Sequence, residues 1–407
     1  MKTELDAIMQ ARQLDGIIVT GSAQHNPAMV YLTGGAHITH GILVKARGQD
    51  AVLYVNPMER DEAAATGLRT ELTPGNFMQM LKDNDGDYIQ TYAQLYQMIL
   101  TGLHITKGRL AVYGKIDAGE SYAIYGALQA RLPELEIVGE VRNSAMLQAM
   151  ETKDAEEAAR IRKMGEITVA VVGQVAAFIQ SHKAVDGELV SAAGTPLTIG
   201  DIKNKINLLV AEHGVENPHG CIFAIGRDSG VPHSTGSPQD TLRLGETIVF
   251  DIFLQEAGGG YHYDFTRTWC LGYAPPEAQA LYDDVLAVFT ELMDGIEANM
   301  PFHALQQRTC ELFEARGHPT VASDPKTQSG YVHGIGHGLG LQVHENPSTY
   351  DRSALLRPGV VVTVEPGLYY PERGLGCRLE DSIYVHSDGR IEVLAHYPLD
   401  LVLPVQT

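Results

Sequence analysis

The sequence predicts a two-domain protein of mixed α/β (α+β) class, with an α/β domain over residues 1–150 and a second domain over residues 152–402. Three observations predict this organisation. A chain of 407 residues exceeds the size of one compact core. In its first part, short apolar runs alternate with polar stretches of helical pattern. In its second part, a β-branched run that leads to an acidic residue occurs twice.

The composition argues against several classes of protein. Hydrophobic residues make up 44% of the chain and charged residues 20%, as in ordinary globular proteins. The sequence contains no run of about 18 apolar residues, which is the length that spans a bilayer. The formal charge of −20 repels nucleic-acid phosphates. The N-terminus has early acids and no apolar signal-peptide core, so we expect a cytoplasmic protein. The four cysteines lie far apart, and most of them are expected to be reduced packing residues.

The first domain shows strand-like runs at residues 16–19 and 51–55 but no catalytic constellation. His25, His37 and His40 lie near a pair of glycines, and their spacing matches no metal-binding pattern. We therefore expect loop or surface histidines in this domain.

The second domain is expected to begin with a long helix. Thr152 can cap it, and the acids Asp154, Glu156 and Glu157 then suit the positive end of the helix dipole. Mostly apolar residues follow at alternating spacings of three and four, which predicts an amphipathic helix that packs against the sheet of this domain. They are Ile161, Met164, Thr168, Val171, Val175 and Phe178.

A short internal repeat marks the second domain. Residues 242–245 precede Asp251 by the interval at which residues 356–359 precede Glu365, with five residues between the glycine and the acid in each case. Each half is predicted to place this acid at a strand's end and a second acid on the returning strand, and the two halves are expected to face one another. The second acids are Asp264 and Glu380. Chance similarity is the alternative, because the match is short.

Residues 245–270 are typical of a β-hairpin, because two runs of β-branched and aromatic residues flank three glycines. With a loop centred on Ala257 and Gly258, Asp251 is expected to lie directly opposite Asp264. Like charges with Cβ atoms ~5 Å apart are destabilising. The pair therefore needs a proton, a cation or solvent, and a divalent metal ion is one answer.

Alternate glycines surround His337 within residues 331–345. Glycine lets the backbone approach a ligand closely or take a positive φ, and it leaves few side chains in front of His337. The alternative is a flexible turn, and no phosphate-binding pattern is present.

The acids and this imidazole together form a hard, oxygen-rich set of ligands. The set is Asp251, Asp264, His337, Glu365 and Glu380. It suits Mn²⁺, with Co²⁺, Fe²⁺ or Zn²⁺ also feasible. Two divalent ions balance four carboxylates, which can hold the ions ~3.5–4 Å apart with a hydroxide between them for attack on a carbonyl. That geometry implies hydrolysis, whereas in the alternative the acids form scattered surface salt bridges.

On these residues, positions 218–385 resemble metallopeptidase family M24, a family of "pita-bread" fold with pseudo-twofold halves that contains methionine aminopeptidase, aminopeptidase P and prolidase. The whole chain is similar to the last two proteins, which carry an additional N-terminal domain of the creatinase/prolidase type. The family pattern is Asp, Asp, His, Glu, Glu in that order, and all five positions are filled here.

The resemblance implies a role for each ligand. Asp251 would chelate one metal ion, Asp264 and Glu380 would bridge both ions, and His337 and Glu365 would complete the other. Glu365 would also act as general base on the bridging water.

The resemblance extends to residues around the ligands. His233 matches a histidine that contacts the substrate near the scissile bond, and His344 matches one that stabilises the tetrahedral intermediate. His333 matches a histidine that helps to form the substrate pocket in the proline-specific branch. Arg378 lies two residues before Glu380 and so on the same strand face, where it orients Glu380 or pairs with a carboxylate. Packed structural histidines and a surface arginine are the alternatives.

The sequence also departs from the family pattern. The family's Asp-x-Gly-Ala run is replaced by residues 251–254, and twelve residues rather than ten separate Asp251 from Asp264. A hairpin that is longer by two residues keeps each side chain on its face of the sheet. We therefore expect this chain to differ from the family in the shape of the hairpin loop and in the fit of the substrate.

The resemblance thus implies a two-metal exopeptidase, with Mn²⁺ favoured, that cleaves the Xaa-Pro bond at the N-terminus of dipeptides or short peptides. Proline matters because its tertiary amide lacks an N–H. We expect a small peptide as substrate and a homodimer as the assembly, with no nucleic acid or membrane partner. One alternative is other chemistry on the same fold, such as a metal-dependent lyase or a creatinase-like hydrolase. The other is a binding protein on an inactive scaffold, which the intact ligand set disfavours.

Overall fold

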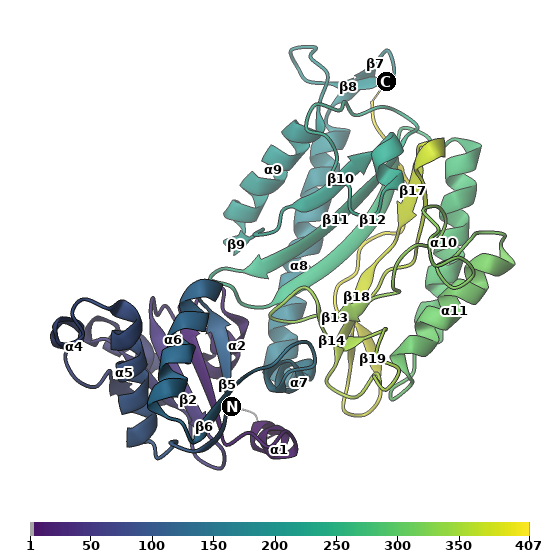
Figure 1. The fold of residues 1–407 in the computed structure, drawn as a ribbon. Helices are drawn as coiled ribbons and strands as arrows, with labels where there is room; N and C mark the ends of the chain where they lie inside the picture. Colours follow the sequence, from purple (N-terminus) through teal and green to yellow (C-terminus); the bar gives the residue numbers. More distant parts are fainter. Residues whose placement is uncertain (1–3, 407) are drawn as a thin grey trace. The chain divides into compact units, whose positions relative to one another are not determined.

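The computed structural model describes residues 4–406, and these form two compact units (Figure 1). The first unit comprises residues up to Met150 together with Gly258–Gly260, and the second comprises the remaining residues from Glu151 onward. Within the described residues, no helix has the length and apolar character that crossing a membrane requires.

The first unit contains a mixed sheet in the order β4-β3-β2-β1-β5-β6. Its strands are β1 (Gly16–Gly21), β2 (Gly41–Ala46), β3 (Val52–Val55), β4 (Arg69–Leu72), β5 (Gly108–Lys115) and β6 (Leu135–Gly139). Its helices are α1 (Glu4–Ala11), α2 (Pro27–Thr33), η1 (Pro57–Glu59), α3 (Arg60–Ala65), α4 (Phe77–Asp83), α5 (Tyr88–Gly102), α6 (Ala118–Arg131) and α7 (Ala145–Glu151).

The sheet of the first unit is covered on both faces. Ile17 and Val19 of β1 pack with α1, α2 and α7, whereas Ile18 between them packs with α4, α5 and α6. Successive side chains of a strand point to opposite faces, so an apolar run such as β1 requires a layer on each side.

The second unit contains two larger sheets. The first has the order β10-β11-β12-β20, with β9 beside β11, and the second has the order β14-β13-β15-β18-β19. The strands of the first are β9 (Val215–Glu216), β10 (Cys221–Ile225), β11 (Thr247–Glu256), β12 (His262–Leu271) and β20 (Val402–Leu403). Those of the second are β13 (His337–Gly338), β14 (Glu345–Ser348), β15 (Val361–Val364), β18 (Asp381–Val385) and β19 (Ile391–Val393).

Smaller elements complete the second unit. Its two-stranded sheets are β7 (Lys183–Val185) with β8 (Glu188–Val190), and β16 (Gly367–Tyr370) with β17 (Leu375–Arg378). Its helices are α8 (Ala155–Gln180), α9 (Ile199–Glu212), η2 (Gly226–Gly230), α10 (Pro276–Asp294), α11 (Phe302–Ala315) and η3 (Pro371–Arg373). Residues of α10 and α11 share an apolar core with β15 and β18. All four cysteines are buried and free, as predicted.

The long helix at the start of this unit has the predicted packing but a different cap. Asp154, rather than Thr152, accepts hydrogen bonds from the first turn of α8, and Glu157 closes a capping box. The backbone of Thr152 is engaged in a bridge with Val360 and so lies outside the helix. The predicted apolar positions of α8 from Ile161 to Val175 are buried, and the helix packs against β11 and β12.

The hairpin of β11 and β12 is present, but its predicted register is wrong by two residues. Asp251 pairs with Thr266, and Asp264 pairs with Phe253. The turn is centred on Gly258 and Gly259, which have positive φ angles of 82° and 89°. Ala257 would be strained in that conformation, so the two glycines set the turn. A shift by two keeps Asp251 and Asp264 on the same face of the sheet.

The acids of the repeated pattern take different places in the two halves. Glu365 directly follows β15, as predicted, but Asp251 lies inside β11, which continues to Glu256 because its end pairs with β9. Each half contains an antiparallel pair, β11 with β12 and β15 with β18. The two larger sheets meet at a bridge between Thr266 and Glu380, so β12 lies beside β18 (Figure 1).

Candidate metal centre

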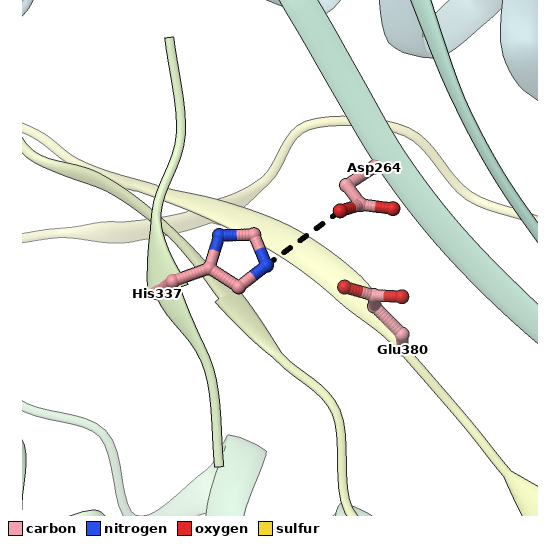
Figure 2. A group of neighbouring side chains, drawn as sticks. All are labelled: Asp264, His337 and Glu380. Carbon is pink, nitrogen blue, oxygen red and sulfur yellow. Dashed lines mark ion pairs between the residues drawn. The ribbon is translucent and has the colours of Figure 1, made fainter. Parts of the chain in front are cut away.

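Three predicted ligands converge where the two larger sheets meet. Ligand atoms of Asp264, His337 and Glu380 all lie within 4.8 Å of one another. Figure 2 shows the imidazole and the two carboxylates pointing toward one another from three separate segments. Asp264 comes from β12, His337 from the start of β13, and Glu380 from the residue just before β18. Carboxylate and imidazole groups in this arrangement are typical ligands of a divalent transition-metal ion.

Glu365 completes the same cluster. Its Oε1 lies 3.5 Å from Nε2 of His337, and the same nitrogen lies 3.6 Å from Oδ2 of Asp264. The backbone N–H of Glu365 donates to the carbonyl of Ile335, which fixes the segment after β15 against the glycine-rich loop. Glu365 thus joins the other three ligands through His337, which brings four of the five predicted ligands to one place.

The fifth predicted ligand, Asp251, is held by an arginine. Nη2 of the buried Arg378 lies 2.5 Å from Oδ2 of Asp251. The same guanidinium donates to the hydroxyls of Thr266 and Tyr369. Of the two roles expected for Arg378, the structure therefore has the ion pair with a carboxylate, and the carboxylate is that of Asp251 rather than Glu380.

The charges of this centre are unbalanced without a cation. Burial, and then the neighbouring carboxylates, raise the pKa of Asp264 and Glu380 well above their usual range. Burial is also the main cause that raises the pKa of Glu365 to about 8, although Arg378 opposes this shift. Carboxyl groups in such surroundings hold protons until a cation replaces them.

Two buried oxygens provide a further test of whether the residues fit a metal ion. Oδ1 of Asp251 and Oε1 of Glu380 are fully buried and lack a hydrogen-bond partner among the described residues. An unpaired buried oxygen is costly, and it is rare in native proteins unless water or an ion satisfies it. The unpaired oxygens and the oxygen-rich donor set therefore fit divalent cations.

The imidazole of His337 is oriented for ligation. Nδ1 lies 3.1 Å from the carbonyl oxygen of Gly338, so it carries the proton and donates it. Nε2 then presents its lone pair toward Asp264 and Glu365. Burial, followed by the charge of His344, lowers the pKa of His337 to about 3, which keeps the ring neutral. A ring nitrogen fixed by a backbone carbonyl is the usual support of a metal-binding histidine.

The other predicted histidines lie around this cluster. His344 is exposed, and its ring centroid lies 4.2 Å from that of His337. His233 is exposed after η2, and its charge lowers the pKa of both His344 and His333 after the larger effect of burial.

His333 is half-buried and has both ring nitrogens engaged. Nδ1 lies 2.7 Å from the carbonyl of Gly334 and donates to it, so Nε2 accepts from the hydroxyl of Tyr369 at 2.8 Å. This hydroxyl in turn accepts from Arg378. His333 thus offers a ring surface rather than a free nitrogen to anything bound beside it.

The glycines around His337 serve a different purpose from the predicted one. Gly336 and Gly338 do not have positive φ angles. A Cβ atom on either would lie 2.0 Å from a backbone carbonyl oxygen, that of Thr363 or that of Asn346. The glycines therefore let this loop lie directly against neighbouring strands and so hold His337 in place.

A buried ion pair also supports the loop, although no sequence signal pointed to it. Nζ of Lys153 lies 2.9 Å from Oε2 of Glu345, and both side chains are almost fully buried. Glu345 also accepts a hydrogen bond from the backbone N–H of Gln342, which precedes His344 in the chain. The pair joins the segment before α8 to the residue that follows His344.

Comparison with known protein families identifies the two parts of the chain. The description "Metallopeptidase family M24" matches residues 159–387, which is more than half of the chain. The description "Creatinase/Prolidase N-terminal domain" matches residues 2–141. Both parts therefore have the mixed α/β organisation that the sequence predicted.

Individual relatives and solved structures agree with this assignment. A Bacillus subtilis (strain 168) protein named "Putative dipeptidase YkvY" is 34% identical over 180 residues, which is 44% of this chain and 46% of that protein. The match thus spans less than half of that relative. Among solved structures, a dipeptidase from Pyrococcus horikoshii OT3 has a TM-score of 0.75 at 22% identity, with 98% of each chain covered. An Xaa-Pro dipeptidase from Bacillus anthracis also has a TM-score of 0.75, at 20% identity, and covers 98% of this chain and 99% of its own. At these identities the structures share the fold, and with the matched family and its clustered ligands they lead to one conclusion: the protein belongs to metallopeptidase family M24 and carries a creatinase/prolidase N-terminal domain.

Proposed function

We propose that this protein is an exopeptidase that hydrolyses the Xaa-Pro bond at the N-terminus of dipeptides or short peptides. The observation that carries the proposal is the approach of Asp264, His337 and Glu380 within 4.8 Å of one another, with Glu365 beside them. Membership of a metallopeptidase family implies divalent metal ions at such a cluster. The proline preference is supported by the fold shared with a protein titled Xaa-Pro dipeptidase.

Five side chains would hold two divalent cations, with Mn²⁺ favoured by the hard donor set. They are Asp251, Asp264, His337, Glu365 and Glu380. When bound, the cations supply Lewis acidity at the scissile carbonyl and offset the charge of the four carboxylates. Arg378 pairs with Oδ2 of Asp251, and Oδ1 of Asp251, which lacks a hydrogen-bond partner among the described residues, is the atom that a cation would take.

The chain's own residues carry the proton transfers. Glu365 is the general base that takes a proton from the attacking water, and its buried carboxylate is suited to this because burial raises its pKa. His344, exposed beside His337, donates an N–H to the oxyanion that develops on the carbonyl. His233, at the same mouth, contacts the substrate near the scissile bond.

The wall proposed to receive the proline ring is aromatic. The ring centroid of His333 lies 5.4 Å from that of Tyr331 and 5.3 Å from that of Tyr369. Tyr331 and Tyr369 are fully buried behind the half-buried ring of His333, so His333 is the part of this wall that a proline ring would meet, and its nitrogens are used within the protein. A compact apolar ring packs well on such a surface.

A substrate panel tests the proposal. Metal-loaded protein should hydrolyse Gly-Pro and Ala-Pro and leave Gly-Ala nearly intact, because the aromatic wall selects the proline ring. Comparison with Gly-Pro-Ala shows whether dipeptides or longer peptides are preferred. Elemental analysis should find about two divalent ions per chain. Equal rates on Gly-Pro and Gly-Ala would remove the proline preference, and cleavage of no peptide would favour the lyase alternative.

The base assignment is tested with a matched pair of variants. Glu365→Gln should lower kcat by at least about 10²-fold, because it removes the group that accepts the proton. Glu297→Gln makes the same chemical change at an exposed position of the same unit and should leave kcat unchanged. A near-normal kcat for Glu365→Gln would contradict the assignment.

A further inference from the structure

The face of β11 and β12 that carries the metal ligands continues toward the hairpin turn. Side chains of directly paired residues in an antiparallel sheet lie on the same face. Asp251 pairs with Thr266, Phe253 with Asp264, and Gln255 with His262. Phe253 and His262 are therefore the next side chains on the site's own face, one step beyond the ligands.

An imidazole from a different segment covers this part of the face. His219 lies just before β10, and its ring is stacked on that of His262 with centroids 5.9 Å apart and an interplanar angle of 24°. Its centroid lies 6.3 Å from that of Phe253. His262 is buried and its Nδ1 lies 3.4 Å from the carbonyl of Phe253, whereas His219 is exposed. His219 is therefore the exposed member of the stack, and its ring carries an N–H donor.

The opposite end of the site is closed. Arg378 contacts Thr266 and Thr268 of β12, on the side of the ligands away from the turn. Its partners there are Tyr369 and, through Tyr369, His333, whose polar atoms are used within the protein. The closed aromatic end suits the proline ring, which leaves the side of His219 for the side chain of the residue before proline.

The surroundings of His219 favour an acidic side chain. His219, His233 and His344 are all exposed in this part of the second unit. A ring N–H of an imidazole donates hydrogen bonds, and a carboxylate accepts such bonds more strongly than a neutral side chain does.

We propose that His219 is a specificity-determining residue that donates a hydrogen bond to an acidic side chain, glutamate or aspartate, of the substrate's N-terminal residue. The inference rests on the proposed Xaa-Pro peptidase function and adds a substrate class to it. The favoured substrates are Glu-Pro and Asp-Pro dipeptides or peptides that begin with these sequences.

Specificity ratios test this subsite. Glu-Pro and Met-Pro have N-terminal side chains of similar length, and metal-loaded protein should prefer Glu-Pro by about tenfold in kcat/KM, mainly through a lower KM. His219→Phe keeps an aromatic ring on His262 but has no donor, so the ratio should fall to about one. His219→Gln restores a donor and should recover part of the preference. His182→Phe removes an imidazole that also has an aromatic neighbour, Phe178, at the far end of α8, and should keep the wild-type ratio.

A binding measurement separates this inference from the peptidase function. The protein used is Glu365→Gln with ¹³C-labelled histidine, loaded with Zn²⁺ and checked for bound metal by elemental analysis because Glu365 is also a proposed ligand. The His219 resonance is assigned by its absence in His219→Phe. Glu-Pro should shift this resonance more than Met-Pro does. Equal shifts, or a Glu-Pro to Met-Pro ratio that His219→Phe leaves unchanged, would overturn the subsite while leaving the Xaa-Pro function intact. Cleavage of no Xaa-Pro substrate, with a selective shift retained, would overturn the peptidase function alone.

Discussion

The carboxyl groups of Asp264, Glu365 and Glu380 are placed where carboxylates are least stable without a partner. Asp264 and Glu380 are buried, Glu365 is half-buried, and each lies near at least one of the others. Folding alone does not favour such an arrangement, because taking like charges out of water raises the free energy of the folded state. Cations that bind the folded state would lower that free energy by mass action.

This leads to a pH dependence of stability in the metal-free protein. The pKa of Glu365 is raised from 4.5 to about 8 on folding. Below about pH 4.5 both states are protonated, and stability does not depend on this group. Between about pH 4.5 and about pH 8 the unfolded state releases its proton first, so the free energy of unfolding falls as pH rises. Asp264 and Glu380 shift in the same direction.

Thermal unfolding in the presence of a chelator measures the effect. The Tm of the wild-type protein should fall from about pH 5 to about pH 8. Glu365→Gln cannot ionise at this position, so its Tm should fall less over the same range. Equal slopes for the two proteins would contradict the raised pKa of Glu365.

Single residues of the site were predictable from sequence to different degrees. The five ligand candidates could be found because each stands in a recognisable run, such as the glycine-rich loop around His337 or the strand that leads to Asp251. Lys153 and Tyr369 could not. Lys153 meets Glu345 across 192 residues, and neither side chain belongs to a motif. The sequence also left open which carboxylate pairs with Arg378. The alternation of side chains along a strand shows which face Arg378 lies on, but it does not show which residues of another strand lie opposite.

At the scale of elements, the loop that presents His337 depends on close backbone approach. A Cβ atom on Gly338 would lie 2.0 Å from the carbonyl oxygen of Asn346, whereas one on Gly334 would lie 3.2 Å from the hydroxyl of Thr349, which can move. Backbone contacts of the first kind leave no room for adjustment, because both segments are held by strand pairing.

A matched pair of alanine substitutions tests this. Gly338→Ala should lower the free energy of unfolding by about 1–3 kcal/mol or more and reduce the bound metal, because the strand that carries His337 must move. Gly334→Ala should stay within about 0.5 kcal/mol of the wild type and keep its metal. Urea unfolding and elemental analysis of both variants measure the two quantities. Equal behaviour of the two variants would show that close packing at Gly338 does not position His337.

The register of the β11 and β12 hairpin shows why some element-level detail cannot be obtained from sequence. Three consecutive glycines allow several turn centres, and only the conformation of Gly258 and Gly259 selects one. Parity survives a slip of two residues, so the face of each acid was correct although its partner was wrong. The cap of α8 differed from the predicted one for a similar reason. The backbone of Thr152 forms a bridge with the distant residue Val360, which the sequence does not reveal.

At the scale of the whole molecule, all five candidate ligands belong to the second unit. Metal binding should therefore protect this unit directly. In hydrogen exchange followed by mass spectrometry, peptides that cover residues 247–271 and 361–385 should exchange more slowly after Mn²⁺ loading, because ligation holds β11, β12, β15 and β18 together. Peptides from β1 and β2 in the first unit serve as the internal reference and should change little.

The opposite pattern, with protection in β1 and β2 alone, would contradict the placement of the metal centre.

The homodimer expected from the sequence stays a prediction, which sedimentation of the metal-loaded protein would test. The overall α/β class was predictable because strand and helix patterns are local, whereas the meeting of the two larger sheets depends on contacts between distant segments.

The bridge between Thr266 and Glu380 joins residues 114 positions apart. A contact of that span forms slowly, because the conformational entropy of a long loop is lost before the contact can stabilise the chain. During biosynthesis the emerging chain can display Asp251 and Asp264 long before Glu380 exists. The candidate metal centre would consequently be one of the last features of the second unit to form, and uptake of metal would report that these distant segments have met.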